Sequence, residues 1–189
     1  MRLPPLYILR HGQTLWNVEG RLQGHLDSAL TEQGLAQACA QARIMAALTL
    51  PEDTGFFVSP LGRTRRTADI ALAGLGPIQF DDRLREINAG GWEGRLRSEI
   101  QPGMTATEKL PFEMFADAPG GEGLDGLETR VASFLADLRT PAVIVSHGVA
   151  ISVLRGLILG LDRGAMAALG NPQGVVIEIK NGEEITHEA

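Results

Sequence analysis

The chain has 189 residues, of which 44% are hydrophobic and 21% are charged, values typical of a soluble globular protein with a sizeable core. Its 17 basic and 23 acidic side chains give a formal charge of -6, which argues against nucleic acid or an anionic membrane as a general partner. An anionic ligand would therefore have to be held in a local positive pocket.

The first predicted element is a short apolar strand at residues 6–9, followed at once by Arg10, His11 and Gly12. A continuous apolar run of this length is typical of a buried parallel strand. Ligands of open parallel sheets bind outside the carboxyl ends of the strands. Arg10 and His11 are therefore expected where ligands usually bind, and Gly12 would let the backbone turn sharply.

Two helices and a strand are predicted next. Thr31 would cap a helix that ends near residue 48, with a core-facing stripe spaced three or four residues apart at Leu35, Ala38, Cys39, Ala42 and Met45. Residues 56–58 read as a strand, and Ser59 with Pro60 suit the N-cap and first position of a second helix. Arg63 would then lie in its first turn, and its apolar face would be Leu61, Ala68, Ala71 and Leu72.

The middle of the chain is less regular. Residues 77–80 predict a weak strand, and three glycines in the segment 84–94, which contains Glu86, argue against a regular element. Residues 95–126 carry three prolines and the APGGEG sequence. They are expected to form an irregular cover over the sheet and not a domain.

Regular elements are predicted again from Leu127. A helix is expected there first, then a strand over residues 142–146 that ends in His147 and Gly148, and then an apolar helix over 149–159. The last elements are two short strands joined by the two-residue turn Asn181-Gly182, a strong hairpin signal.

Strands that alternate with helices predict an α/β fold, a three-layer sandwich with a mostly parallel central sheet and helices on both faces. A chain of this length most simply forms one domain over residues 1–189. Four strands would then deliver polar residues to one edge of the sheet: Arg10 with His11, Ser59 with Arg63, Glu86, and His147.

Two arginines, two histidines and a carboxylic acid suit a phosphate site with a nucleophile. Arg10 and Arg63 can pair bidentately with phosphoryl oxygens, and a neutral His11 can attack phosphorus if its other ring nitrogen donates to a carbonyl. His147 could donate to the equatorial oxygens, and Glu86 could protonate the leaving oxygen.

Each residue also has a structural interpretation. His147 could be a turn histidine, Glu86 a solvated loop acid, and Arg63 one member of a surface run with Arg65 and Arg66. A metal site fits poorly, because two cations accompany the one carboxylate at these strand ends. A serine or cysteine nucleophile lacks a second placed base.

The motifs occur in an order that resembles the histidine phosphatase superfamily, whose fold is shared by phosphoglycerate mutases and many phosphatases. The sequence LRHGQTLWN is similar to the opening signature of that family, SPLGRTRRTA to its second motif, LREINAGGWEG to its third and VSHGVAI to its last. The resemblance covers nearly the whole chain. The sequence departs from the family pattern at Ala29, Thr64 and Gly123, and none of these is a proposed catalytic residue.

The resemblance implies roles for the site residues. His11 would become phosphorylated, with Arg10 and Arg63 binding phosphate, Glu86 donating a proton and His147 as the second catalytic histidine. Further phosphate or substrate contacts would come from Asn17, Gln23, Gly24 and Gly148. No metal and no cofactor are implied.

If the phosphoryl group on His11 is transferred to water, the protein is a phosphatase. If it is transferred to a second alcohol, the protein is a mutase. Residues 95–126 offer only Arg95, Arg97 and Lys109 as cations against six carboxylates, a cover expected to repel a bisphosphate. Hydrolysis of a small phosphorylated metabolite is the preferred hypothesis. A phosphoglycerate mutase and a non-catalytic binder of phosphorylated ligands are the alternatives.

The leaving group would contact an apolar lip formed by Trp16, Leu26, Trp92, Phe112 and Phe115. Alternatively, the aromatic residues of this set only pack the cover onto the sheet. His25 and His187 are expected to be solvated. The single cysteine, Cys39, would be a packed helix residue in a reducing compartment, so the expected location is the cytoplasm. The chain indicates neither a membrane span nor an oligomeric state.

Overall fold

The computed structural model describes residues 3–105, 108 and 110–189. Its strands form one sheet in the order β3-β2-β4-β1-β5-β6. Their bounds are Leu6–Arg10 (β1), Gly55–Val58 (β2), Ile78–Phe80 (β3), Ala142–Ser146 (β4), Val176–Lys180 (β5) and Glu183–His187 (β6). β1 to β4 are parallel to one another, whereas β5 pairs antiparallel with β1 and forms an antiparallel hairpin with β6.

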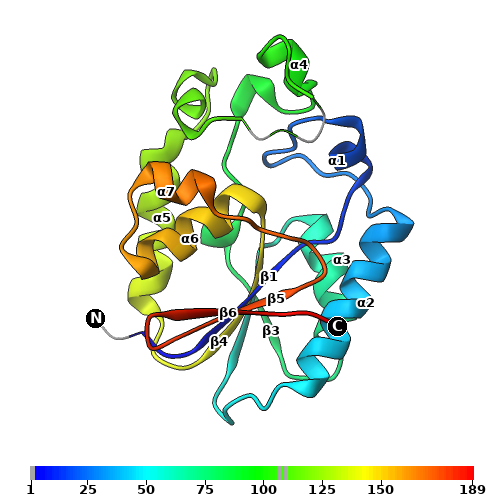
Figure 1. The fold of residues 1–189 in the computed structure, drawn as a ribbon, viewed down its shortest axis with the longest axis vertical. Helices are drawn as coiled ribbons and strands as arrows, with labels where there is room; N and C mark the ends of the chain where they lie inside the picture. Colours follow the sequence, from blue (N-terminus) through cyan, green and yellow to red (C-terminus); the bar gives the residue numbers. More distant parts are fainter. Residues whose placement is uncertain (1–2, 106–107, 109) are drawn as a thin grey trace.

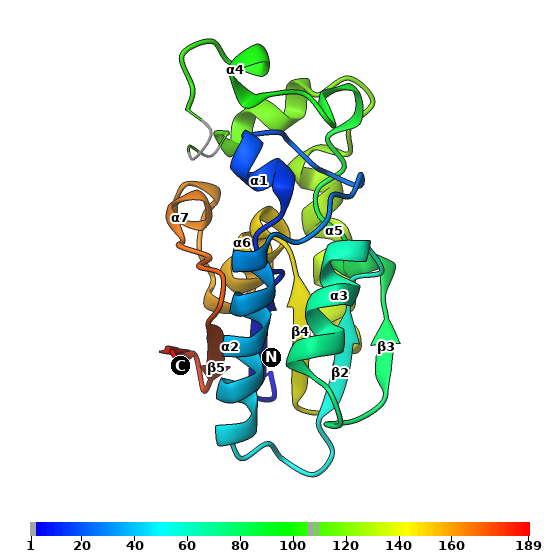
Figure 2. The same cartoon turned by 90° about the vertical axis from the view of Figure 1, so that its right-hand side faces the viewer.

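Helices cover both faces of the sheet (Figures 1 and 2). One face carries α2 (Glu32–Ala47) and α3 (Gly62–Ala71). The other carries α5 (Gly123–Asp137) and α6 (Gly148–Leu159), beside which α7 (Arg163–Ala168) packs. The predicted α/β sandwich with a mostly parallel sheet is confirmed.

The central strands are buried on both faces, which explains their unbroken apolar sequences. In β1, Tyr7 and Leu9 belong to the core beneath α2 and α3, whereas Leu6 and Ile8 belong to the core beneath α5 and α6. Arg10 pairs with Ser146 in the register of β1 and β4. The residues that follow these two strands, His11 and His147, are therefore neighbours at one edge of the sheet.

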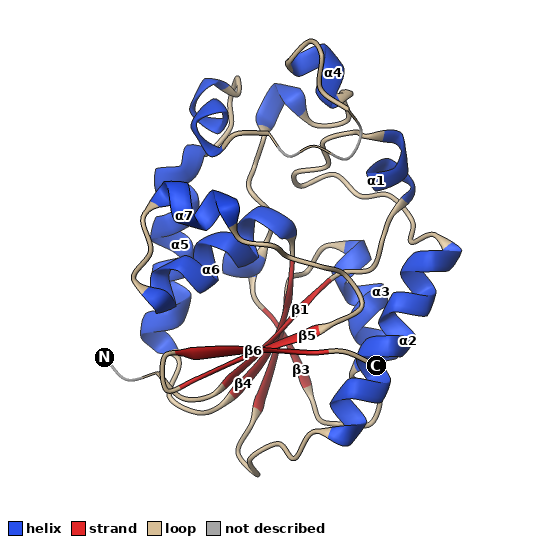
Figure 3. Cartoon of the chain, in the orientation of Figure 1, coloured by secondary structure: helices blue, strands red, loops and turns tan. Residues whose placement is uncertain are grey.

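Segments around the carboxyl edge of the sheet form the upper part of the molecule (Figure 3). They include α1 (Leu15–Glu19), α4 (Arg97–Ile100) and short 3-10 turns at Asp82–Leu84, Gly90–Trp92 and Phe112–Asp117. The sequence did not predict α1, α4, α7 or these turns. No helix in the described part of the chain has the length and apolar character needed to cross a membrane.

The first turn of α3 corrects one prediction. The helix begins at Gly62, and its N-cap Leu61 lies two residues after the predicted cap Ser59. The Asp27 carboxylate supplies the cap from a distant loop, because its oxygens accept from the backbone N–H groups of Gly62 (2.6 Å) and Arg63 (3.3 Å). A cap from another segment leaves no signal in the local sequence.

The buried stripe of α2 is also shifted from the prediction. Ala38 and Met45 are buried as expected, but Gln41 and Ile44 complete the stripe and Cys39 is exposed. Gln41 explains the shift: its Nε2 donates to the backbone oxygens of Arg10 (2.9 Å) and Val175 (3.1 Å). A polar residue with such partners is stable in the core, although a hydrophobic pattern does not count it.

Candidate active site

A cavity of about 180 Å³ lies at the carboxyl edge of the sheet. Nine site residues were predicted from the sequence. Eight of them line the cavity: Arg10, His11, Asn17, Gln23, Gly24, Arg63, Glu86 and Gly148. His147 does not line it and lies fully buried behind Arg63. The His11 and His147 ring centroids are 5.2 Å apart.

His11 has the geometry of a nucleophile. Its Nδ1 lies 2.8 Å from the Gly12 carbonyl oxygen, and because a carbonyl only accepts, Nδ1 must carry the proton. The lone pair is then on Nε2. Burial above all, together with the nearby charges of Arg63 and Arg10, lowers the pKa of His11 well below its ordinary value of 6.5, so the ring is neutral at physiological pH.

The backbone around His11 depends on two glycines in close contact. A Cβ on Gly12 would lie 2.3 Å from the Gly34 oxygen, and one on Gly34 would lie 2.1 Å from the Gln13 oxygen. Both distances are far below van der Waals contact. The start of α2 is thus pressed directly against the loop that carries the proposed nucleophile.

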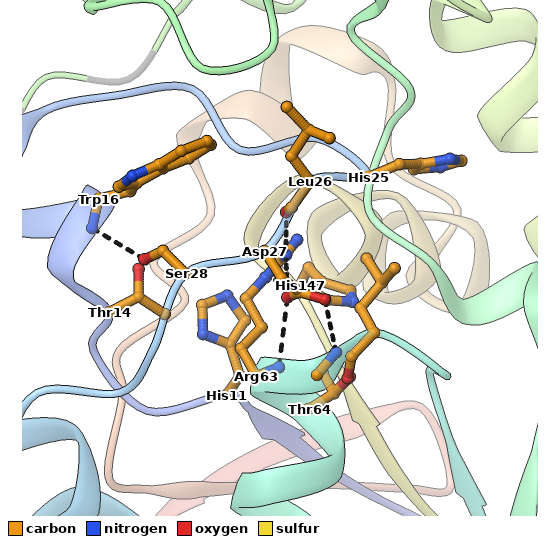
Figure 4. Close-up of polar contacts among 12 residues, drawn as sticks. His11, Thr14, Trp16, His25, Leu26, Asp27, Ser28, Arg63, Thr64 and His147 are labelled. Atoms are coloured by element: carbon orange, nitrogen blue, oxygen red, sulfur yellow. Dashed lines mark hydrogen bonds and ion pairs between the residues drawn. The ribbon is translucent and has the colours of Figure 1, made fainter.

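Most N–H groups of the Arg63 guanidinium donate to other groups of the protein (Figure 4). Its Nη1 donates to the Leu26 oxygen (2.7 Å) and to Asp27 Oδ1 (2.8 Å), its Nη2 to the Gly24 oxygen (2.8 Å) and its Nε to His147 Nδ1 (3.0 Å). A guanidinium has five N–H groups. Only one, on Nη2, remains for a phosphate, so the predicted bidentate pairing by Arg63 is not present in this arrangement.

The ring of His147 is likewise engaged on both sides. Because Arg63 Nε donates to Nδ1, the proton is on Nε2, which donates to Ser59 Oγ at 2.7 Å. Burial, followed by the charge of Arg63, lowers the pKa of His147 well below its ordinary value of 6.5. The one ring proton is therefore donated to Ser59. To donate to a phosphate, His147 would have to release Ser59 Oγ, or release Arg63 and carry a proton on Nδ1.

Arg10 offers the more available guanidinium. Its Nη1 donates to the Asn171 backbone oxygen (2.9 Å), while its buried Nε has no hydrogen-bond partner among the described residues. Burial lowers the pKa of Arg10, but an arginine remains charged at neutral pH. An unpaired donor next to His11 is suited to an anionic oxygen.

The Glu86 carboxylate lies at the N-terminus of α6. Oε1 accepts from the backbone N–H groups of Ile87 (3.1 Å) and Ala150 (3.0 Å), and Oε2 from that of Val149 (3.2 Å). Its backbone oxygen accepts from His25 Nε2 and Arg130 Nη2. His25 was expected to be solvated, but it supports the Glu86 backbone.

The remaining nominated residues come from the loop after β1. Asn17 Oδ1 accepts from the Thr14 N–H (3.1 Å), which leaves its amino group as the donor for a ligand. Gln23 is buried, and its Oε1 lacks a partner within the described chain. Gly24 needs to be glycine, because φ is +53° and a Cβ would lie 2.1 Å from Glu93 Oε1.

Apolar and charged residues of the cover complete the cavity. Phe112 and Phe115 line it, as predicted, and are 4% and 2% exposed. The other proposed lip residues, Trp16, Leu26 and Trp92, are not among its lining residues. Arg97 lines it, although it had been counted only as one cation of an acidic cover, and Lys109 lies outside the described residues.

Three contributors were missed by sequence reasoning: Asp27, Asn171 and Gln173. Asp27 binds Arg63, the Asn171 backbone oxygen binds Arg10, and Gln173 Nε2 donates to the His11 backbone oxygen (2.9 Å). None directly follows a strand of the parallel part of the sheet, which was the signal for residues such as His11 and His147, and none lies in the motifs that carried the family resemblance.

The two buried histidines predict an acid-sensitive fold. Below about pH 6.5 the unfolded chain binds a proton on each ring that the folded chain does not, so the free energy of unfolding decreases as the pH falls below 6.5. Each ring contributes up to about 1.4 kcal/mol per pH unit until its folded-state pKa is reached. Urea unfolding between about pH 7 and pH 5.5 measures this slope.

The variant His147→Gln provides the comparison. It removes one of the two buried titrating rings, so the dependence of unfolding free energy on pH should become shallower than in the unmodified chain. Equal slopes for the two proteins would show that His147 does not titrate differently in the folded and unfolded states.

Comparisons with known proteins identify the family. The model of the histidine phosphatase superfamily (branch 1) matches residues 6–187. The chain belongs to the histidine phosphatase superfamily. A Salmonella choleraesuis protein named "Probable phosphoglycerate mutase GpmB" is 38% identical over 164 residues, which cover 82% of this chain and 75% of that protein.

Solved structures with other names share the fold. YhfR from Bacillus stearothermophilus is 30% identical, with a TM-score of 0.77 over 98% of this chain and 95% of that one. The alpha-ribazole phosphatase from Shigella flexneri has the same TM-score of 0.77 at 24% identity, over 98% of this chain and 94% of that one. Membership of the superfamily makes this chain an enzyme of the phosphatase and mutase type.

Proposed function

We propose that the protein is a metal-independent phosphomonoester hydrolase that acts through a phosphohistidine at His11. The first support is the His11 ring, whose Nδ1 donates to Gly12 and whose Nε2 lone pair is left for attack. Arg10 and the free Nη2 hydrogen of Arg63 would bind the phosphoryl oxygens. In the first step the His11 Nε2–P bond forms, the ester P–O bond breaks and Glu86 protonates the leaving oxygen.

The second step returns the site to its starting state. Water loses a proton to Glu86 as its oxygen attacks phosphorus, the P–N bond breaks and inorganic phosphate leaves. Glu86 thereby regains the proton that it gave to the leaving oxygen, and the backbone N–H groups of Ile87, Val149 and Ala150 hold its carboxyl group in place.

The choice of water over a second alcohol is supported by one observation, the apolar side chains that line the cavity. They are Leu22, Ile87, Leu110, Phe112, Phe115 and Val149. Such a wall favours a substrate whose leaving group is partly apolar. These six side chains provide no polar contact to a small, doubly anionic mutase substrate.

Phosphoglycerate mutase activity is the second candidate, and Arg97 is the observation that favours it. Burial lowers the pKa of Arg97, and its positive charge is close enough to lower the pKa of Arg10. A cation at this place could attract a second anionic group, which the count of charges in the cover had argued against.

Two assays separate the candidates. A panel of phosphorylated metabolites and generic aryl phosphates at near-neutral pH should release inorganic phosphate, with preference for substrates whose alcohol carries an apolar group. Isomerisation of 3-phosphoglycerate should be negligible with and without a bisphosphate primer. Fast primer-dependent isomerisation would establish the mutase instead.

A further inference from the structure

A loop outside the sequence motifs forms hydrogen bonds with residues of the candidate site. It comprises residues 170–174 and joins α7 to β5. Its Asn171 oxygen accepts from Arg10 Nη1 at 2.9 Å, and its Gln173 Nε2 donates to the His11 backbone oxygen at 2.9 Å. The loop therefore contacts Arg10, the last residue of β1, and His11, which follows it.

The Asn171 side chain is fully engaged within the protein. Its Nδ2 donates to the Gly148 oxygen (2.9 Å) and to Ser152 Oγ (2.6 Å), and its Oδ1 accepts from Arg155 Nη1 (2.6 Å). Since an amide has two N–H groups, neither remains for a substrate. Asn171, which is 5% exposed, therefore acts on the protein around the cavity and not on a ligand through its amide.

Arg155 connects this loop to the outer edge of the sheet. It is 4% exposed, and its Nε and Nη2 form a bidentate pair with Glu184 Oε2 (2.8 Å) and Oε1 (2.5 Å) of β6. Its Nη1 also donates to the Gly170 oxygen. A buried guanidinium that loses its carboxylate must find other acceptors, and Arg155 already contacts the Gly170 oxygen and the Asn171 Oδ1 of the 170–174 loop.

We propose that Glu184, Arg155 and Asn171 are positioning residues for Arg10. The bonds run from Glu184 on the edge strand through Arg155 to the Asn171 side chain, and the Asn171 backbone oxygen then holds Arg10 Nη1. This contact orients the guanidinium and leaves its buried Nε for the ligand. The proposal rests on the proposed function in that Arg10 is taken to bind a phosphoryl group.

The test uses a matched pair of substitutions on β6. Glu184→Gln removes the charge that binds Arg155, and Glu183→Gln makes the same change at the exposed neighbouring residue. The dissociation constant of inorganic phosphate is measured by calorimetry, KM and kcat with an aryl phosphate, and Tm by thermal unfolding. Because no turnover is needed for calorimetry, phosphate affinity is read independently of catalysis.

Glu184→Gln should raise the phosphate dissociation constant and KM by about threefold to tenfold, because misplacing a binding group by a fraction of an ångström is costly. Glu183→Gln should leave both within twofold. Arg155→Lys, which keeps the charge but not the bidentate geometry, should change the phosphate affinity in the same direction as Glu184→Gln, and it serves as the second variant.

The outcomes distinguish the two proposals. If Glu184→Gln lowers Tm but leaves phosphate affinity and KM unchanged in the folded protein, these residues are only structural and the positioning role is overturned. If the unmodified protein binds phosphate but hydrolyses no ester, the proposed function fails while the affinity comparison still decides the positioning role. A protein that does not bind phosphate contradicts both.

Discussion

Replacement of His11 by alanine should reduce kcat for any phosphomonoester by about 10⁴-fold or more, because the nucleophile that forms the covalent intermediate is removed. The loss should not come from unfolding. Burial and the charges of Arg63 and Arg10 disfavour a proton on the His11 ring, so the alanine variant lacks a group whose protonation would destabilise the fold at low pH. Steady-state release of inorganic phosphate, with Tm as the check on folding, measures the effect.

His187→Ala is the matched control. His187 lies on β6, where its Nε2 pairs with Glu178 Oε2 at 2.8 Å, away from the residues that line the cavity. Its turnover should equal that of the unmodified protein within twofold. A His11→Ala protein that is folded and retains a tenth of the activity would rule out His11 as the nucleophile.

Glu86→Gln should give the second largest effect, and its size should depend on the leaving group. With an alkyl phosphate, whose alkoxide is a poor leaving group, kcat should fall by about 10²-fold to 10⁴-fold, as is typical when a general acid is lost. With 4-nitrophenyl phosphate, whose leaving group departs without a proton, the fall should be much smaller. The ratio of the two activities is the measurement.

The comparison of substrates acts as an internal control for damage to the site. Glu86 also accepts from the N–H groups of Val149 and Ala150 at the start of α6, so its replacement disturbs backbone that lines the cavity. Such damage would slow both substrates alike. Equal losses for alkyl and aryl esters would therefore show that Glu86 has a structural role and does not donate the proton.

The placement of the site could be predicted because it follows from strand ends. Arg10 and His11 end the first strand, His147 ends the fourth, and parallel pairing of Arg10 with Ser146 makes their ends coincide. Continuous apolar runs revealed these strands. Periodicity likewise located α2 and α6, although the buried Gln41 shifted the α2 stripe and left Cys39 exposed.

The hydrogen-bonding state of the site could not be predicted in the same way. Arg63 was expected to pair bidentately with phosphate, yet the loop containing Gly24, Leu26 and Asp27 accepts three of its N–H bonds and His147 accepts another. These contacts join segments that are far apart in the sequence. No periodicity or motif records which backbone oxygen will face a particular side chain.

Counting charges could not locate those that face the cavity, for a related reason. The cover was predicted to repel a bisphosphate because its carboxylates outnumber its cations, and of those charges Arg97 and Glu108 line the cavity. The field in a pocket depends on which charges face it and how well they are screened. The net charge of a segment does not determine either quantity.

The most direct test of the account is to trap the covalent intermediate. The full chain is mixed with a phosphomonoester, denatured rapidly at alkaline pH and analysed by intact mass and peptide sequencing. The account predicts one phosphoryl group per chain, carried on His11, lost on acid treatment and absent from His11→Ala. Phosphoryl transfer to another residue, or hydrolysis that continues undiminished in His11→Ala, would contradict it.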